Sequence, residues 1–138
     1  AGTRAAIAEV AAVFDAEAMT AVWDAALRAP AWDRSPVWFH GDFHTGNLLT
    51  SGGRLSAVID FGGLGVGDPA GDLTIAFSLL SAPGRAAFRE ALAVDDARWA
   101  RGRGLALSAG LNAYTSYAAA NPRVAVETTR QITAAISG

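Results

Sequence analysis

The sequence contains no cysteine and little charge of either sign. Without cysteine the chain can form neither disulfides nor thiolate metal sites. None of its apolar runs reaches the roughly 18 residues that a membrane helix needs, and no signal peptide is visible. The net charge of −2 leaves no strongly basic face for nucleic acid. We therefore expect a soluble, cytoplasmic protein that binds neither nucleic acid nor a membrane.

Lysine is also absent, because all eleven basic residues are arginines. The only methionine is Met19, and the chain begins Ala1-Gly2-Thr3 without an initiator Met, as in a piece of a longer or processed protein. The 138 residues, of which 51% are hydrophobic, are enough for one compact domain with a real core.

Apolar residues recur at helical spacing at both ends of the chain, in residues 7–27 and 69–136. Between these stretches, the apolar runs 48–50 and 55–59 flank Ser51-Gly52-Gly53, a pattern typical of a β-hairpin. The sequence therefore predicts an α+β fold that is predominantly α-helical, with one small hairpin. The polar residues able to do chemistry concentrate at the two ends of that hairpin.

The segment HGDFHTGN, residues 40–47, enters the hairpin, and Asp60 leaves it thirteen residues after Asn47. Because a hairpin can bring its two ends together, the Asn47 carbonyl oxygen and the Asp60 carboxylate are expected to meet. Such hard oxygen ligands suit Mg²⁺, which takes one or two carboxylates beside substrate phosphates. Asp42 would remain a carboxylate without a metal, which is the base that phosphoryl transfer needs.

Three motifs in this region resemble those of the aminoglycoside phosphotransferase and choline kinase-like family, which has a protein-kinase-like fold. His40-x-Asp42, with Asn47 five residues past the aspartate, resembles the catalytic loop of that family. Ile59-Asp60-Phe61-Gly62 resembles its metal-binding element, and GDPAGDL, residues 67–73, resembles its Gly-Asp-Pro-x-x-Asp-Leu motif. The resemblance spans residues 38–73, and three motifs in order at matching separations form a specific signal.

The resemblance implies an ATP- or GTP-dependent kinase that phosphorylates a hydroxyl of a small molecule, such as an antibiotic, choline or a sugar. An antibiotic acceptor would imply a role in antibiotic resistance. Asp42 would accept or orient the hydroxyl proton, while Asn47 and Asp60 would hold Mg²⁺ and, through it, the nucleotide. The residues expected to support the site structurally are His40, Asp68 and Asp72. The candidate substrate contacts are His44, Arg101 and Tyr114.

The resemblance covers only a C-terminal lobe of such an enzyme. A complete kinase of this kind also has an N-terminal nucleotide-binding lobe with a glycine-rich strand pair and a lysine, and this chain contains no lysine. We therefore expect residues 1–138 to be the C-terminal catalytic and substrate lobe. On this hypothesis the chain is an incomplete fragment, weakly active or inactive without its missing N-terminal lobe.

Other interpretations are weaker. A metal-dependent hydrolase built on His40, Asp42 and His44 would want more histidines than the two present. The glycine-rich run 62–67 fails the dinucleotide-binding spacing, because the next required glycine falls on Asp68, and it is better interpreted as a flexible loop. The main alternative is a non-catalytic helical module that retains the motif and binds a ligand or partner. An aminoglycoside is cationic and would want an acidic pocket. The C-terminal helices carry several arginines and few acidic residues, so the sequence gives no strong case for an aminoglycoside as acceptor.

Overall fold

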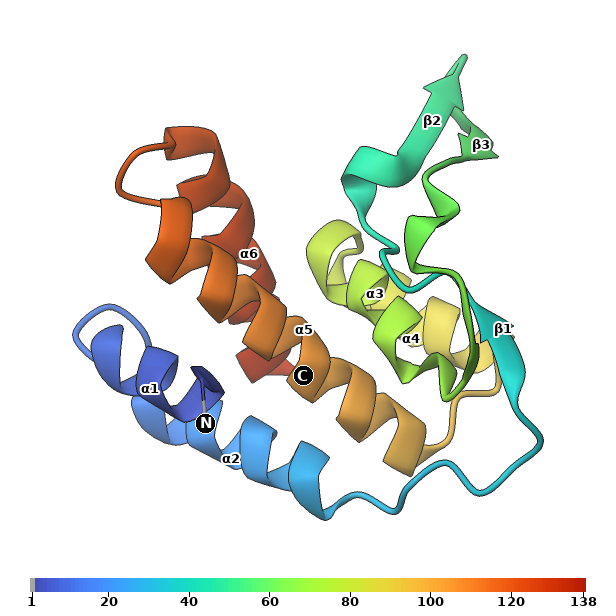
Figure 1. The fold of residues 1–138 in the computed structure, drawn as a ribbon. Coiled ribbons are helices and arrows are strands. Elements are labelled where there is room, and N and C mark those ends of the chain that lie inside the picture. Colours follow the sequence, from blue (N-terminus) through green and yellow to red (C-terminus); the bar gives the residue numbers. More distant parts are fainter. Residues whose placement is uncertain (1) are drawn as a thin grey trace.

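The computed structural model describes residues 2–138, in which helices pack around one long central helix (Figure 1). The helices are α1 (Gly2–Glu9), α2 (Ala16–Arg28), α3 (Thr74–Leu79), α4 (Ala82–Ala91), α5 (Asp96–Tyr117) and α6 (Pro122–Ser137). The largest fully buried side chains are Phe77, Met19, Leu107, Leu111 and Ile132. The core thus lies where α2, α3, α5 and α6 meet.

Helix α5 can occupy the centre because glycines on it admit close neighbours. A Cβ at Gly104 would lie 2.2 Å from the Cβ of Ala26 on α2, and one at Gly102 would lie 2.7 Å from the Cβ of Leu73. Asp95 begins α5 as its N-cap and accepts a hydrogen bond from the Arg98 backbone at 2.7 Å. Helix α5 is therefore pinned at its start and packed closely along its first half.

The small strands form two antiparallel pairs. The predicted hairpin is present as β2 (Leu48–Ser51) and β3 (Arg54–Val58), and it projects away from the helices (Figure 1). Its turn uses Gly52 and Gly53, both with positive φ. The fold is thus α+β and predominantly helical, as predicted.

The second strand pair was not expected. Strand β1 (Val37–Phe39) pairs with β4 (Gly65–Gly67), so the end of the glycine-rich run is an ordered strand and the expectation of a flexible loop was wrong there. Glycine is needed at position 65, since a Cβ there would lie 2.5 Å from the Phe39 ring. The pairing anchors the segments that enter and leave the hairpin region.

Three short 3₁₀ helices complete the fold: η1 (Thr45–Asn47), η2 (Phe61–Gly63) and η3 (Pro69–Leu73). Each overlaps one of the three sequence motifs. Within residues 2–138, no helix has the length and apolar character required to span a membrane.

Candidate active site

The loop that follows β1 is held by a carboxylate from the helical part of the chain. Asp72 of η3 accepts hydrogen bonds from the backbone N–H groups of His40 at 2.7 Å and Gly41 at 3.0 Å. Hydrogen bonds to a charged acceptor are stronger than those between neutral groups. Asp72 therefore fixes the start of the loop against the body of the molecule.

The buried His40 ring links this loop to the segment of Asp60. The backbone N–H of Asp42 donates to His40 Nδ1 at 3.2 Å, so the proton of the neutral ring sits on Nε2. His40 Nε2 in turn donates to the carbonyl of Ile59 at 2.8 Å. The Phe61 ring packs on the His40 ring, with centroids 4.7 Å apart. His40 thus links the Asp42 loop to the segment of Asp60, and it does not line the cavity that Asp42 lines.

The two loops also touch through their backbones at Gly41 and Gly63. Gly41 has a φ of +83°, and a Cβ at this position would lie 2.0 Å from the carbonyl oxygen of Gly63. No residue with a side chain fits there without moving one of the loops. The close approach holds the loop of Asp42 beside the loop of Asp60.

Pairing of β2 with β3 brings Asn47 and Asp60 to the same end of the hairpin. Leu48 pairs with Val58, and the backbone N–H of Ile59 donates to the Asn47 carbonyl at 3.0 Å. Asn47 and Asp60 therefore flank the last pairing of the hairpin, next to the loop of Asp42.

The side chains of Asn47 and Asp60 offer oxygen atoms of the kind that Mg²⁺ binds. Asn47 is buried, and its Nδ2 donates to the Asp42 carbonyl at 2.8 Å and lies 3.3 Å from Asp42 Oδ2. Its Oδ1 is therefore the atom that could bind a metal ion. Asp60 is exposed, has a left-handed backbone with φ of 59°, and makes no capping hydrogen bond at η2. One amide oxygen and one carboxylate fit a Mg²⁺ ion whose other ligands are waters and phosphates.

Residues 2–138 contain no group of three or more His, Cys, Asp or Glu side chains suited to holding a metal ion. A metal site here would therefore depend on ligands from substrate and water, as Mg²⁺ sites in phosphoryl transfer do. This donor set does not fit a closed structural metal site.

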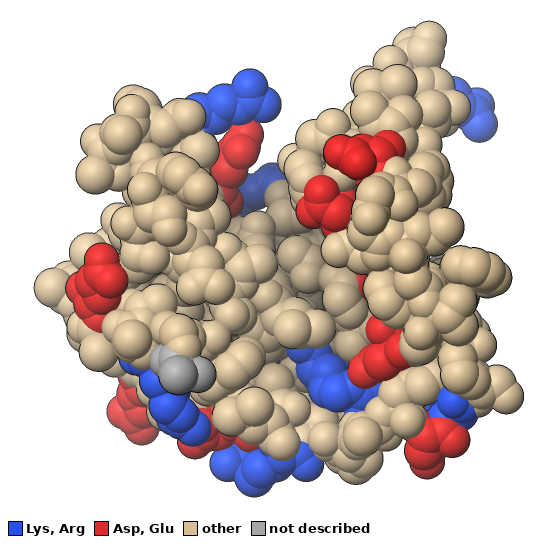
Figure 2. Space-filling view, in the orientation of Figure 1, with Lys and Arg blue, Asp and Glu red and all other residues tan. Residues whose placement is uncertain are grey.

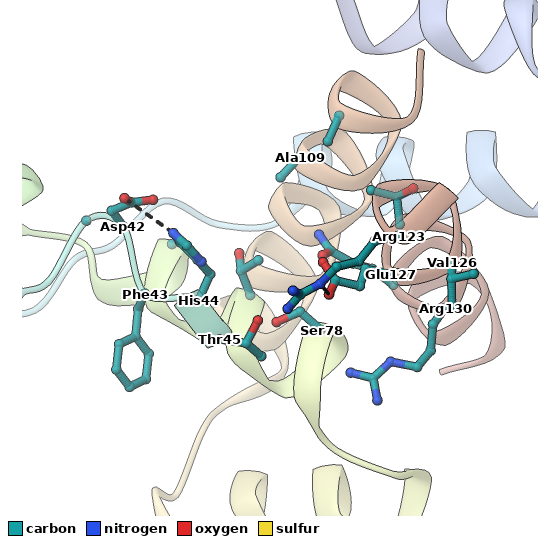
Figure 3. Close-up of a pocket in the computed structure, with 16 residues that line it drawn as sticks. Asp42, Phe43, His44, Thr45, Ser78, Ala109, Arg123, Val126, Glu127 and Arg130 are labelled. Atoms are coloured by element: carbon teal, nitrogen blue, oxygen red, sulfur yellow. Dashed lines mark hydrogen bonds and ion pairs between the residues drawn. The ribbon is translucent and has the colours of Figure 1, made fainter. Parts of the chain in front are cut away.

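Asp42 faces a cavity of about 790 Å³ (Figure 3). Its side chain is 58% exposed. Next to it, His44 accepts a hydrogen bond from the Gly46 backbone on Nδ1 at 3.1 Å, and its Nε2 lies 3.5 Å from Asp42 Oδ2. Asp42 and His44 therefore line the same cavity side by side.

Arg101 and Tyr114, the other two candidate substrate contacts, lie elsewhere. Arg101 donates from Nε and Nη2 to the Asp68 carboxylate, at 2.8 and 3.3 Å, and also to the Pro30 carbonyl. Tyr114 packs edge-on against Phe14 beside the core. Neither residue lines the cavity in front of Asp42. Asp68 supports the fold through Arg101 and by capping η3.

The opposite wall of the cavity comes from α6, which sequence reasoning did not place in the site. Arg123, Glu127 and Arg130 line the cavity from this helix. Their spacing of four and then three residues marks one polar face of a helix, but that signal alone does not show which structure the face meets. Only the fold brings α6 opposite the loop of Asp42.

Comparison with known proteins agrees with this arrangement. The phosphotransferase enzyme family matches residues 3–105. Among solved structures, the chain resembles a thermostable mutant of aminoglycoside phosphotransferase APH(4)-Ia in a ternary complex with AMP-PNP and hygromycin B, with 25% identity and a TM-score of 0.52. It also resembles the apo form of a thermostable mutant of that enzyme, with 27% identity and a TM-score of 0.51. No curated protein matches the chain.

These similarities cover 98% of this chain but 51% of each solved structure, so the chain spans about half the length of the proteins it resembles. The kinase-like fold predicted from the three motifs is confirmed by these structures. The family match includes the loop of Asp42, the hairpin and the η3 segment, and it extends over more than half of the chain. The chain therefore belongs to the phosphotransferase enzyme family.

Proposed function

We propose that this chain is the C-terminal, catalytic and substrate-binding lobe of an enzyme that transfers the γ-phosphoryl group of ATP or GTP to a hydroxyl of a small molecule. One observation carries the proposal. The β2–β3 pairing sets Asn47 and Asp60 at one end of the hairpin, and Asn47 also donates to Asp42. The candidate base and the two candidate oxygen ligands thus lie together, because Asn47 is hydrogen-bonded both to Asp42 and to Ile59, the residue before Asp60.

Asp42 is the residue placed to act on the acceptor. During transfer, the acceptor oxygen bonds to the γ-phosphorus, the bond from that phosphorus to the β–γ bridging oxygen breaks, and the nucleoside diphosphate leaves. The hydroxyl proton passes to the Asp42 carboxylate, which is exposed to the cavity. Positioning and electrostatics dominate such a reaction, so the contacts that fix Asp42 are as important as its basicity.

Asn47 Oδ1 and the Asp60 carboxylate are the atoms that would hold Mg²⁺. The ion neutralises charge on the nucleotide phosphates when it is bound. The chain prepares these ligands from both sides: Asp42 accepts from Asn47 Nδ2, and His40 donates to the residue before Asp60. A nucleotide donor is supported by the AMP-PNP bound to the similar aminoglycoside phosphotransferase.

A second lobe is part of the proposal. Eight of the fifteen exposed large hydrophobic side chains in residues 2–138 lie between Val37 and Val66, on the strands and loops around the hairpin. Trp38 is 72% exposed there. A cluster of exposed apolar side chains is typical of an interaction surface. An N-terminal lobe seated on this surface would complete the nucleotide cleft and supply the lysine that this chain lacks.

The experiment that tests the site is a thermal-shift titration with Mg·ATP and with Mg·GTP, on the chain and on its Asp60→Asn variant. We expect the nucleotide to raise the Tm of the parent chain and to lose most of that effect in the variant. Asp33→Asn serves as the matched control, because Asp33 is exposed and lies outside the cavity.

Equal shifts for the parent chain and Asp60→Asn would contradict the assignment of Asp60. Omission of Mg²⁺ provides a second control, since a shift that persists without the ion would show binding that does not use these ligands. A Tm that does not respond to nucleotide in the isolated chain, but does respond once the second lobe is added, would place the site across both lobes.

A further inference from the structure

The cavity in front of Asp42 has a charge pattern that restricts the acceptor. Its wall on α6 carries Arg123, Glu127 and Arg130. In Figure 3, Arg123 and Glu127 lie together and reach toward the side of Asp42, and Arg130 extends from the helix below them. Figure 2 shows the same region as a hollow between the end of α5 and α6 and the side that bears the hairpin, with basic and acidic atoms together at the helical rim. The volume of about 790 Å³ suits a molecule of sugar or antibiotic size.

The single carboxylate on the α6 wall is already engaged. Arg123 Nε donates to Glu127 Oε1 at 2.9 Å, so this pair is close to neutral as seen by a ligand. Arg130 has no carboxylate within 4.0 Å among residues 2–138. The wall therefore presents a net positive charge, and the base Asp42 on the other side has to stay available for the hydroxyl proton.

A polycationic acceptor does not suit this wall. Its ammonium groups would need several unpaired carboxylates, but they would meet two guanidinium groups and a carboxylate that is already paired. Like charges placed together across an interface are unfavourable. A carboxylate or phosphate group, by contrast, matches the forked donors of a guanidinium.

The floor of the cavity favours hydroxyl groups. Ser78 lines it, and Ser78 Oγ is buried without a hydrogen-bond partner among residues 2–138. A buried hydroxyl left unpaired is costly. Rotation of the Ser78 side chain toward the cavity would let a ligand hydroxyl supply the missing partner. Two uncharged polar side chains of α6 also line the cavity but already have hydrogen-bond partners of their own. Thr128 donates to the Val124 carbonyl, and Gln131 donates to the Ala106 carbonyl.

We infer that the acceptor is a small polyhydroxylated molecule that carries an anionic group, a carboxylate or a phosphate, bound by Arg130 while one of its hydroxyls faces Asp42. The inference rests on the proposed function, since it names the acceptor of the same transfer. Ser78 pairs with a second hydroxyl of this molecule. Arg123 stays paired with Glu127 and closes the rim of the cavity.

The test compares polyhydroxylated acceptors of different charge, using the complete polypeptide that contains this lobe. The panel is glucose, gluconate, glucose 6-phosphate and hygromycin B, as neutral, carboxylate, phosphate and cationic members, at constant ionic strength. Binding is measured by calorimetry without nucleotide, and transfer by acceptor-dependent release of nucleoside diphosphate. We expect an anionic member to bind about 10- to 100-fold more tightly than glucose, and the two anionic arms show which group is preferred.

Two variants connect the effect to α6. Arg130→Gln should remove most of the preference for the anionic member and change binding of glucose by less than about threefold. Arg28→Gln, an exposed arginine on α2 outside the cavity, should keep the preference. Preferred binding of hygromycin B or glucose, or an equal loss for glucose and the anionic member in Arg130→Gln, would overturn the inference.

The two readouts separate this inference from the proposed function. Transfer to neutral or cationic acceptors alone would retain the phosphotransferase and reject the anionic acceptor. Anion binding that depends on Arg130, without transfer to any panel member, would support the binding site. Nucleotide left unconsumed with an acceptor that does bind would count against the proposed function instead.

Discussion

At the scale of single residues, Asp42 combines accessibility with restraint. Its backbone N–H donates to His40 and its carbonyl accepts from Asn47, so the main chain is held on both sides. Its carboxylate remains 58% exposed toward the cavity. A general base needs this combination, because the carboxylate has to reach the acceptor proton from a defined position.

Replacement of Asp42 by asparagine keeps the shape of the side chain and removes its basicity. In the complete enzyme we expect Asp42→Asn to lower kcat by about 10²- to 10⁴-fold, the usual contribution of a general base. The measurement is steady-state release of nucleoside diphosphate with a known acceptor. Asp33→Asn should retain normal turnover, and a rate for Asp42→Asn within threefold of the parent enzyme would exclude the proposed role.

At the scale of elements, the start of α5 is fixed by the contacts of its N-cap residue, Asp95. Asp95 accepts from the Arg98 backbone and pairs with Arg34 at 3.0 Å. The backbone hydrogen bond from Arg98 lowers the pKa of Asp95 below its ordinary value, and the cations of Arg34, Arg98 and Arg101 act in the same direction. The charged carboxylate is thus favoured by folding.

The lowered pKa predicts how stability depends on pH. Because folding depresses the pKa of Asp95, its contribution is complete above the ordinary aspartate pKa of about 4 and is lost as the pH falls below that value. Asp95→Ala should lower the free energy of unfolding by about 1 kcal/mol at pH 7 through loss of the N-cap. The difference from the parent chain should shrink in acid, as measured by urea unfolding at pH 7 and pH 3.

Asp33→Ala is the matched control for this experiment, since Asp33 is exposed and caps no helix. A difference between Asp95→Ala and the parent chain that stays constant from pH 7 to pH 3 would show that the charge of Asp95 does not stabilise α5. Added salt should reduce the electrostatic part of the contribution of Asp95 to the free energy of unfolding, because exposed charges are screened.

At the scale of the whole molecule, the chain carries its own core but leaves an apolar surface around the hairpin. The core residues lie on the helices, whereas Trp38 and Val66 of the paired strands β1 and β4 are exposed. The two solved structures are about twice as long as this chain. The proposed second lobe would cover this surface. A cleft would then form between that lobe and the end of the hairpin that carries Asn47 and Asp60.

Addition of that lobe should be visible in tryptophan fluorescence. Trp99 is already buried, whereas Trp38 is 72% exposed. We expect the emission to shift to shorter wavelength when a separately produced N-terminal lobe is added, because Trp38 leaves water. Trp38→Phe should abolish the shift and Trp32→Phe should preserve it. Association without a shift, or with the shift retained in Trp38→Phe, would place the second lobe on another surface.

The sequence predicted those features that depend on local signals. Ser51-Gly52-Gly53 marks the turn of the hairpin, and Gly52 and Gly53 form that turn with positive φ. The pairing of β1 with β4 was missed, because it joins segments far apart in the sequence and one strand consists largely of glycine. No local pattern shows which partner such a strand will find.

The same limit applies to the site. Asp42, Asn47 and Asp60 were proposed from their spacing around a hairpin, and the structure places them near one another. Their chemical roles remain a prediction. Arg130 was not proposed, because its position in the cavity depends on how α6 packs against α5 and α3. Tertiary packing, rather than residue type, decides which polar face of a helix lines a cavity.

The contact of Gly41 with Gly63 has a consequence for how this site can change over generations. Two loops that meet backbone to backbone have no side chain between them to absorb an adjustment. A substitution at either glycine displaces the other loop, and with it the candidate base or the candidate metal ligand. The two positions therefore behave as one unit under mutation, and a change at one requires a compensating change in the other loop.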